Sequence, residues 1–288
     1  MDAYSLRGLF DAAYSRPRAA LLIPALLFVL AATVLGYGAA TGGALDKGID
    51  FTGGSEIQIP VTGDATADEV EAVFGPEASA RVMTGGGTRW VLVETPETYE
   101  QAEVEQMLDD AGIAYTAGQL GIRSLGAAVG SAFFREAQMW AGVALLIMSA
   151  VIFVAFRSLI PSLAVIFAAV TDMLVALAGM SLTGIDLTLG SLAALLMLLG
   201  YSVDTDILLS TRVLKQREGD LKERIWSSIL TGSTMSIAAI AAFTALYLVS
   251  PASTLDQIAA VLIIGLTADL PITWLGNAFI LKWYVERG

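Results

Sequence analysis

The run LTLGSLAALLMLLGYSVDTDILL at residues 187–209 decides the fold class, because it is long and almost wholly apolar. About 20 helical residues, each rising about 1.5 Å, are enough to cross the hydrocarbon core of a bilayer. Five further runs of this kind lie at residues 19–37, 139–156, 160–182, 225–249 and 258–283. The sequence therefore predicts an α-helical polytopic membrane protein with six transmembrane helices, which places both termini on one side.

The composition supports a membrane protein and excludes several classes of chemistry. Of the 288 residues, 56% are hydrophobic and 15% are charged, with a mean hydropathy of +0.69, whereas soluble domains carry about 25% charged residues. Cysteine and histidine are absent, so disulfides, thiolate metal sites and histidine-centred catalysis are excluded. The net charge of −12 opposes a nucleic-acid partner. We expect no enzyme, no catalytic residue, no cofactor and no metal.

Basic residues give the orientation. The connection at 211–224 carries five Lys or Arg residues and the turn at Arg157 carries another, whereas the short connections at 183–186 and 250–257 carry none. The positive-inside rule therefore predicts cytoplasmic N- and C-termini in the cell membrane. Arg16 and Arg18 precede the first span, which is longer than the apolar core of a signal peptide, so we expect an uncleaved anchor.

The segment 38–138 is the only stretch with the composition of a soluble domain, and it holds 16 acidic against 5 basic residues. Strands are predicted at 56–61, 79–83, 90–94 and 113–117. A capping box at Thr66 and Glu69 opens one helix, and Thr95 followed by Pro96 is expected to open another. This βαββαβ order predicts a ferredoxin-like α+β external domain between the first and second transmembrane helices. The expected parts are 1–37, 38–138 and 139–288.

Four acids lie inside predicted spans, namely Asp172, Asp204, Asp206 and Asp269. Placing an acidic side chain at the centre of a transmembrane helix costs about 2.5–3.5 kcal/mol of free energy, so each of these acids is expected to have a structural or functional role. Asp172 and Asp269 have matching depths and could be neighbours, or each could be a neutral acid bonded to another helix. Asp204 and Asp206 lie about 200° apart around one helix, so they face different surfaces. They are either functional or solvated at the membrane interface.

The expected partners of these acids are protons, a second subunit, or hydroxyl groups. The nearby hydroxyls are those of Ser202, Thr231, Ser233 and Thr234. Pro271 should kink the last span. Tryptophan and tyrosine side chains at span ends form the expected interfacial belt; they are Trp140, Tyr247, Trp283 and Tyr284.

Two motifs carry a resemblance to a known family. GIDFTGG at 48–54 and GYSVDTDILLSTR at 200–212 resemble the SecF family, the smaller subunit of the SecD–SecF accessory complex of protein export. SLG at 124–126, FFR at 133–135 and the Thr171-Asp172 pair are also similar to that family. The motif residues are Gly48, Asp50, Phe51, Gly53, Gly54, Gly200, Tyr201 and Ser202.

The resemblance implies an RND-type half-bundle and partnership with SecD, the Sec translocase channel, translocating preproteins and the lipid bilayer. An ion gradient is one candidate energy source, with the four intramembrane acids as candidate coupling residues. Asp204-Thr205 stands where bacterial members have Asn-Asp, and Ser227 stands where the family has a basic residue. The acidic composition and the Asp204 variant are typical of archaeal, halophilic members.

Two other functions share the intramembrane acids. A proton-driven RND exporter of lipids or small molecules normally has two such halves in one chain, so this chain would have to form a homodimer. An intramembrane aspartyl protease would need two acids at matched depth, and only Asp172 and Asp269 qualify, in surroundings that match no protease motif. The glycines at 48, 53 and 54 lack the context of a phosphate loop. An auxiliary subunit of protein export is the favoured interpretation.

Overall fold

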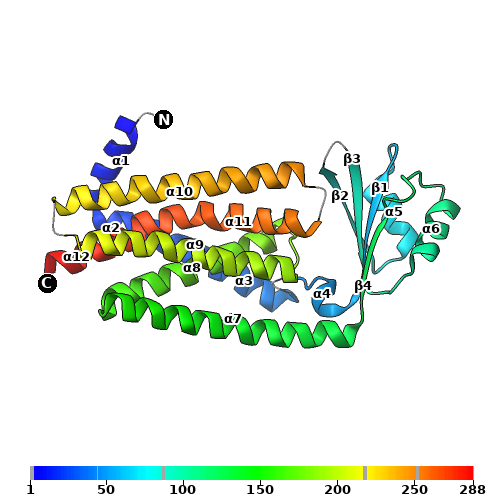
Figure 1. Cartoon of the computed structure of the whole chain (residues 1–288), viewed down its shortest axis with the longest axis horizontal. Coiled ribbons are helices and arrows are strands. Elements are labelled where there is room, and N and C mark those ends of the chain that lie inside the picture. The colour runs from blue at the N-terminus through cyan, green and yellow to red at the C-terminus, as the bar shows by residue number, and fades with distance from the viewer. Residues whose placement is uncertain (1–2, 44, 86–87, 217–218, 251–252, 288) are drawn as a thin grey trace.

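The computed structural model describes residues 3–43, 45–85, 88–216, 219–250 and 253–287. A long bundle of helices forms one end of the molecule, and a small α+β unit projects from the other end (Figure 1). Among the described residues, six helical stretches are long and apolar enough to cross a bilayer. They run over Pro17–Thr41, Val129–Phe156, Leu159–Thr183, Leu189–Leu214, Leu221–Val249 and Thr254–Arg287. The prediction of six transmembrane helices is confirmed.

The helices of the bundle follow the chain in a simple order. The first part of the chain forms α1 (Ala3–Ser15), α2 (Pro17–Ala20) and α3 (Leu22–Thr41). After the α+β unit come α7 (Ala127–Phe156), α8 (Leu159–Thr183), α9 (Leu189–Leu214) and α10 (Leu221–Val249). The last span consists of α11 (Ser253–Pro271), the π-helical turn η1 (Ile272–Asn277) and α12 (Ala278–Arg287).

The second span belongs to a helix that begins earlier than the apolar run predicts. Helix α7 starts at Ala127, directly after the sheet, although its apolar run starts near Met139. Its first turns carry charged residues such as Arg135 and Glu136 and extend beyond the bundle toward the α+β unit (Figure 1). Hydropathy locates the membrane-spanning part of a helix and not its ends, which explains the difference.

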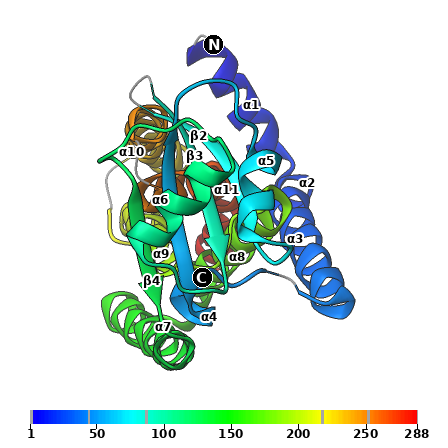
Figure 2. The same ribbon diagram turned by 90° about the vertical axis from the view of Figure 1, so that its right-hand side faces the viewer.

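The α+β unit has the predicted βαββαβ order. It comprises β1 (Gly54–Val61), α5 (Ala67–Phe74), β2 (Ser79–Gly85), β3 (Thr88–Thr95), α6 (Gln101–Asp110) and β4 (Gly121–Leu125), after the short helix α4 (Ile49–Thr52). The strands pair antiparallel in the order β2-β3-β1-β4, which is the ferredoxin-like arrangement. Helices α5 and α6 cover the face of the sheet that points away from the bundle (Figure 2).

The core of this unit lies between the sheet and its two helices. Alternate residues of β1 and β3, such as Ile57, Ile59 and Val91, are fully buried against Val70 of α5 and Leu108 of α6. The capping box at the start of α5 is present, with Thr66 Oγ1 accepting from the Glu69 backbone N–H at 3.2 Å and Glu69 accepting from the Thr66 N–H at 3.0 Å. Both the strand alternation and this cap were readable from sequence.

Two local predictions in this unit are wrong. Thr95 does not cap a helix, because it extends β3 and pairs with Ser55 of β1; α6 begins later, with Glu100 at its N-cap. The last strand is β4 and not 113–117, where only an isolated bridge joins Tyr115 to Val61. Residues 113–117 meet only the last residues of β1, where Thr116 N–H donates to the Pro60 carbonyl at 2.9 Å, and the longer ladder along β1 is formed by β4. The three glycines at residues 85–87 predict a turn between the second and third strands, and residues 86 and 87 lie outside the described residues.

Candidate functional site

The four intramembrane acids fall into two environments. Asp172 of α8, Asp206 of α9 and Asp269 of α11 are 0%, 0% and 1% exposed, whereas Asp204 of α9 is exposed. Helix α11 packs against both α8 and α9, which brings the three buried acids together in the middle of the bundle. The burial of Asp206 excludes interfacial solvation for this acid.

Asp172 and Asp269 are neighbours, as their matched depths predict. The two side chains face each other across the contact between α8 and α11, and Asp172 Oδ1 is buried with no hydrogen-bond donor among the described residues. Ser202 Oγ donates to Asp172 Oδ2 at 2.5 Å, so this member of the GYS motif holds the carboxyl of the neighbouring helix.

Thr273 connects the pair to Asp206. Its hydroxyl lies 3.0 Å from Asp269 Oδ1 and 3.2 Å from Asp206 Oδ1, and Asn277 Nδ2 donates to the same Asp206 oxygen at 2.7 Å. We call Asp172, Asp269, Thr273, Asp206 and Asn277 the acid network. All five side chains are buried.

The turn η1 positions Thr273 and Asn277, the two members of the acid network that lie within it. Pro271 lacks a backbone N–H, so the regular hydrogen-bond ladder is interrupted there, and the helix continues as a π-helical turn over Ile272–Asn277. Thr273 and Asn277 both lie in this turn and face Asp206. The sequence indicated an irregularity at Pro271, but nothing in it indicated Thr273 or Asn277 as partners of the acids.

Some of the hydroxyl groups expected near the acids bond an acid, and others bond elsewhere. Ser202 bonds an acid, but Thr231 Oγ1 accepts from Arg212 Nη1 at 3.0 Å and Thr234 donates to the carbonyl of its own helix at Leu230. The Arg212 guanidinium also lies 2.8 Å from the Ser227 carbonyl oxygen and 3.3 Å from Ser227 Oγ. The guanidinium of Arg212 in α9 therefore lies beside Ser227 of α10.

Asp204 lies on a different surface from the acid network. It shares the outer face of α9 with the exposed Gly200, with Tyr201, which is 38% exposed, and with Met197, which is 43% exposed. Asp204 is ten residues before the end of its span, or about 15 Å along the helix axis. We call these four residues the α9 outer face. It combines small, aromatic and acidic residues within the membrane-spanning length.

The GIDFTGG motif joins the α+β unit to the bundle. Gly53 and Gly54 have φ angles of 81° and 123°, and a Cβ atom on them would lie 2.5 Å from Ala127 and 2.1 Å from the Thr95 carbonyl oxygen. Only glycine fits both the backbone conformation and the space. Phe51 is buried and contacts the Phe134 ring edge-on, with centroids 5.3 Å apart. The motif is thus a packed junction and not a ligand loop.

Asp50 is the polar centre of this junction. It is 2% exposed, and its Oδ1 accepts from Arg123 Nη1 of β4 at 2.9 Å while its Oδ2 accepts from the Leu189 backbone N–H at 2.9 Å. Arg123 also pairs with Glu56 at 3.1 Å. The nearby carboxylates of Glu56 and Asp50 outweigh burial and raise the pKa of Arg123.

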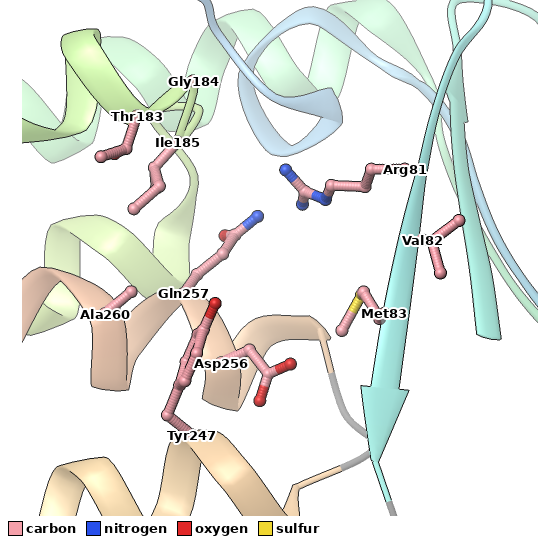
Figure 3. Close-up of a pocket in the computed structure, with 10 residues that line it drawn as sticks. All are labelled: Arg81, Val82, Met83, Thr183, Gly184, Ile185, Tyr247, Asp256, Gln257 and Ala260. Carbon is pink, nitrogen blue, oxygen red and sulfur yellow. The ribbon is translucent and has the colours of Figure 1, made fainter. Parts of the chain in front are cut away.

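A cleft of about 190 Å³ separates the β2 edge of the sheet from the ends of α8, α10 and α11 (Figure 3). Arg81 and Met83 of β2 face Gln257 and Asp256 of α11 across it, with Tyr247 of α10 at one side. The Gln257 side-chain oxygen accepts from Thr188 Oγ1 at 2.7 Å, so its orientation is fixed. The cleft is small, has both polar and apolar lining residues, and lies where the two parts of the molecule meet.

Two acids next to this cleft hold their protons more tightly than usual. Burial raises the pKa of Glu94 in β3 to about 7; Arg81, 3.3 Å away, opposes the shift, and Asp186 and Glu56 add to it. Burial also raises the pKa of Asp186 in the α8–α9 connection. The Arg81 guanidinium lies 3.3 Å from Glu94 and 4.0 Å from Asp186, so this arginine joins the sheet to the bundle at this point.

The part of the chain that the structure describes has no group of three His, Cys, Asp or Glu side chains placed to hold a metal ion. Hydroxyl and amide donors engage one oxygen of Asp172 and one of Asp206, whereas Asp172 Oδ1 and Asp206 Oδ2 have no donor among the described residues.

Comparisons with known families match most of the chain. The family described as protein export membrane protein SecD/SecF, C-terminal, matches residues 104–287, and the SecD/SecF GG motif matches residues 44–65. The chain is 41% identical to the protein-export membrane protein SecF of Methanothermobacter thermautotrophicus, with 96% of each chain covered. It is 38% identical to the protein of the same name from Haloferax volcanii, over 96% of this chain and 94% of that one.

A solved structure shares the fold. The crystal structure of SecDF from Thermus thermophilus, described as a translocon-associated membrane protein, superimposes with a TM-score of 0.71 at 22% identity. The match covers 94% of this chain and 38% of that longer chain. The six-helix bundle with its α+β unit is therefore an arrangement known from a larger protein.

Proposed function

Because this chain belongs to the SecD/SecF family of protein-export membrane proteins and is similar to SecF members over nearly its whole length, we propose that it assists Sec-dependent export as the membrane partner of SecD. The role is auxiliary and not enzymatic. The chain supplies one six-helix half of a two-part membrane assembly, in the cell membrane with both termini in the cytoplasm.

The exposure of Asp204 is the single observation that carries the partnership with SecD. A carboxyl group about 15 Å inside a span costs about 2.5–3.5 kcal/mol if it faces lipid. Intramembrane acids almost always face a bundle interior or a water-filled cavity. The α9 outer face therefore needs a second membrane subunit to cover it, and its exposed Gly200 allows a neighbouring helix to approach closely.

The acid network is the candidate coupling site. Asp206 Oδ2 and Asn277 Oδ1 are buried with no hydrogen-bond donor among the described residues. A proton on Asp206 Oδ2 would supply one donor in this region, and Asp172 Oδ1 is likewise buried with no donor among the described residues. Gain or loss of such a proton changes the hydrogen bonds between α9 and η1, and so links ion movement to helix position.

The α+β unit is the part placed to meet translocating preproteins outside the membrane. It joins the bundle through the GIDFTGG motif and the Asp50 hydrogen bonds, so a force on the sheet reaches the first turn of α9 directly. The same helix carries Asp204 and Asp206. A single rigid element therefore connects the external unit, the acid network and the proposed SecD interface.

Native purification from membranes tests the partnership. The tagged chain should be extracted in mild detergent, and its stoichiometric partners should be identified by mass spectrometry. We expect SecD as the main partner. Recovery of the chain only with second copies of itself would instead favour the exporter of lipids or small molecules, which requires a homodimer.

A further inference from the structure

A cavity of about 490 Å³ lies at the end of the bundle opposite the sheet. Pro17 and Arg18 of α2 and the following Leu21 line one side, and residues of α12 line the other. Its polar lining includes Arg18, Lys282 and Arg287, with Glu286 as its one acid, and its apolar lining includes Leu21, Phe279 and Trp283. The cavity therefore has a basic part and an apolar part, and it joins the first and last spans.

The charges in this cavity are only partly neutralised. Lys282 is 8% exposed, and its Nζ lies 3.6 Å from Glu286 Oε1 and 3.2 Å from the Tyr14 carbonyl oxygen, so it is already engaged. Arg287 stacks over the Trp283 ring at 4.6 Å. Within the described residues, neither Arg287 nor the exposed Arg18 has an ion pair. Two guanidinium groups remain available to an anion.

The cavity opens onto the lipid-facing surface. Helix α3 continues away from Arg18 with a row of exposed apolar side chains, Leu22 at 67%, Leu26 at 58% and Val29 at 56%. Trp283, at 46% exposed, is typical of the membrane interface. An occupant with a negative head and a long apolar tail would match the cavity and the surface beside it.

We propose that this cavity binds an anionic phospholipid, with the headgroup phosphate between Arg18 and Arg287 and an acyl chain along α3. Basic pockets between transmembrane helices on the cytoplasmic side are known to take such headgroups. Planar guanidinium groups suit phosphate oxygens because each can donate two parallel hydrogen bonds. A free phosphate ion would leave the apolar lining unused. The bound lipid bridges the first span and the last span, and so stabilises the packing of α3 on the bundle.

Lipid binding to the full chain in mild detergent tests this proposal, with native mass spectrometry as the readout. Dioleoylphosphatidylglycerol is titrated in parallel with dioleoylphosphatidylcholine and with inorganic phosphate. We expect a saturable one-lipid adduct with phosphatidylglycerol and a higher unfolding temperature in its presence. Phosphatidylcholine and inorganic phosphate should produce neither effect.

The variant R18A/R287A should bind phosphatidylglycerol at least about tenfold more weakly, since each basic residue near an anionic lipid contributes about 1 kcal/mol. The charge-matched control K215A/K222A removes two cations outside the cavity and should bind like the unmodified chain. If R18A/R287A does not fold, the single variant R18A, on an exposed side chain, replaces it. Equal binding by the unmodified and cavity variants, equal loss in the control, or saturation by inorganic phosphate would each overturn the proposal.

Discussion

Asp50 accepts a hydrogen bond from the backbone N–H of Leu189 at 2.9 Å, although the two residues lie 139 positions apart in the chain. Leu189 is the first residue of α9, where backbone N–H groups have no partner within the helix and where a negative charge is favoured. The other Asp50 oxygen holds Arg123 of β4. One buried carboxylate thus fixes the external unit to the helix that carries Asp204 and Asp206.

Substitution of Asp50 should loosen this junction. We expect Asp50→Ala to lower the free energy of unfolding by about 2–4 kcal/mol, because it removes two hydrogen bonds to a buried charge. Asp50→Asn keeps an acceptor for Leu189 and should cost less. Thermal unfolding in detergent measures the change, with Asp64→Ala on an exposed loop as the control. Equal unfolding temperatures for Asp50→Ala and the control would show that the junction does not depend on this carboxylate.

The contact between the sheet and the α8–α9 connection should weaken as the pH rises. Glu94 has a pKa of about 7 in the folded protein against an ordinary value of 4.5, so the folded state binds this proton more tightly than the unfolded state. Its contribution is fully present below about pH 4.5 and is lost as the pH rises to about 7. Arg81, Asp186 and Glu56 are the charged groups that face it.

Unfolding temperatures measured between pH 4.5 and pH 8 test this contact. The unmodified chain should lose stability across that range more steeply than Glu94→Gln, which cannot ionise. Glu97→Gln, three positions further along the chain, is the matched control and should follow the unmodified chain. Parallel curves for all three proteins would contradict the raised pKa of Glu94 in the folded protein.

The topology predicts opposite accessibility for two cysteines introduced into this cysteine-free chain. Thr66→Cys lies in the external unit and should react with an impermeant thiol reagent applied to intact cells. Lys215→Cys lies in the connection after α9 and should react only after the cells are opened. Labelling of Lys215→Cys from outside would reverse the orientation derived from the basic residues.

Hydropathy and turn chemistry predicted much of the architecture, because both depend on residues close together in the chain. The six spans and the strand alternation of Ile57 and Ile59 are of this kind. The last strand was misplaced because the length of pairing with β1, which is one bridge at Tyr115 but five residues for β4, is a long-range property that no local pattern contains.

The depth of a residue within its span follows from the number of residues to the end of the span. This depth correctly predicted that Asp172 and Asp269 are neighbours. The direction of a side chain around the helix axis depends on how helices pack, which no local pattern contains. For this reason Thr273 and Asn277 were not anticipated, and the burial of Asp206 against the exposure of Asp204 was not decided.

Removal of the titratable carboxyl group of Asp206 tests the proposed coupling site. Asp206→Asn remains polar and nearly isosteric, so the chain should insert and fold normally. Export should fall several-fold, and an ionophore that collapses the proton gradient should have no further effect. Asp204→Asn, on the opposite face of α9, should retain the ionophore response even if export is reduced. Normal, ionophore-sensitive export from Asp206→Asn would exclude the acid network as the coupling site.

The central claim is that the α9 outer face is covered by SecD, and site-specific photo-crosslinking tests it most directly. A photoreactive phenylalanine analogue is placed at Tyr201 on that face and, as a control, at Leu26 on the exposed surface of α3. In membranes that contain SecD, irradiation should give a SecD adduct from position 201 and none from position 26. The account is contradicted if position 201 yields no SecD adduct, if both positions yield it equally, or if position 201 captures only a second copy of this chain.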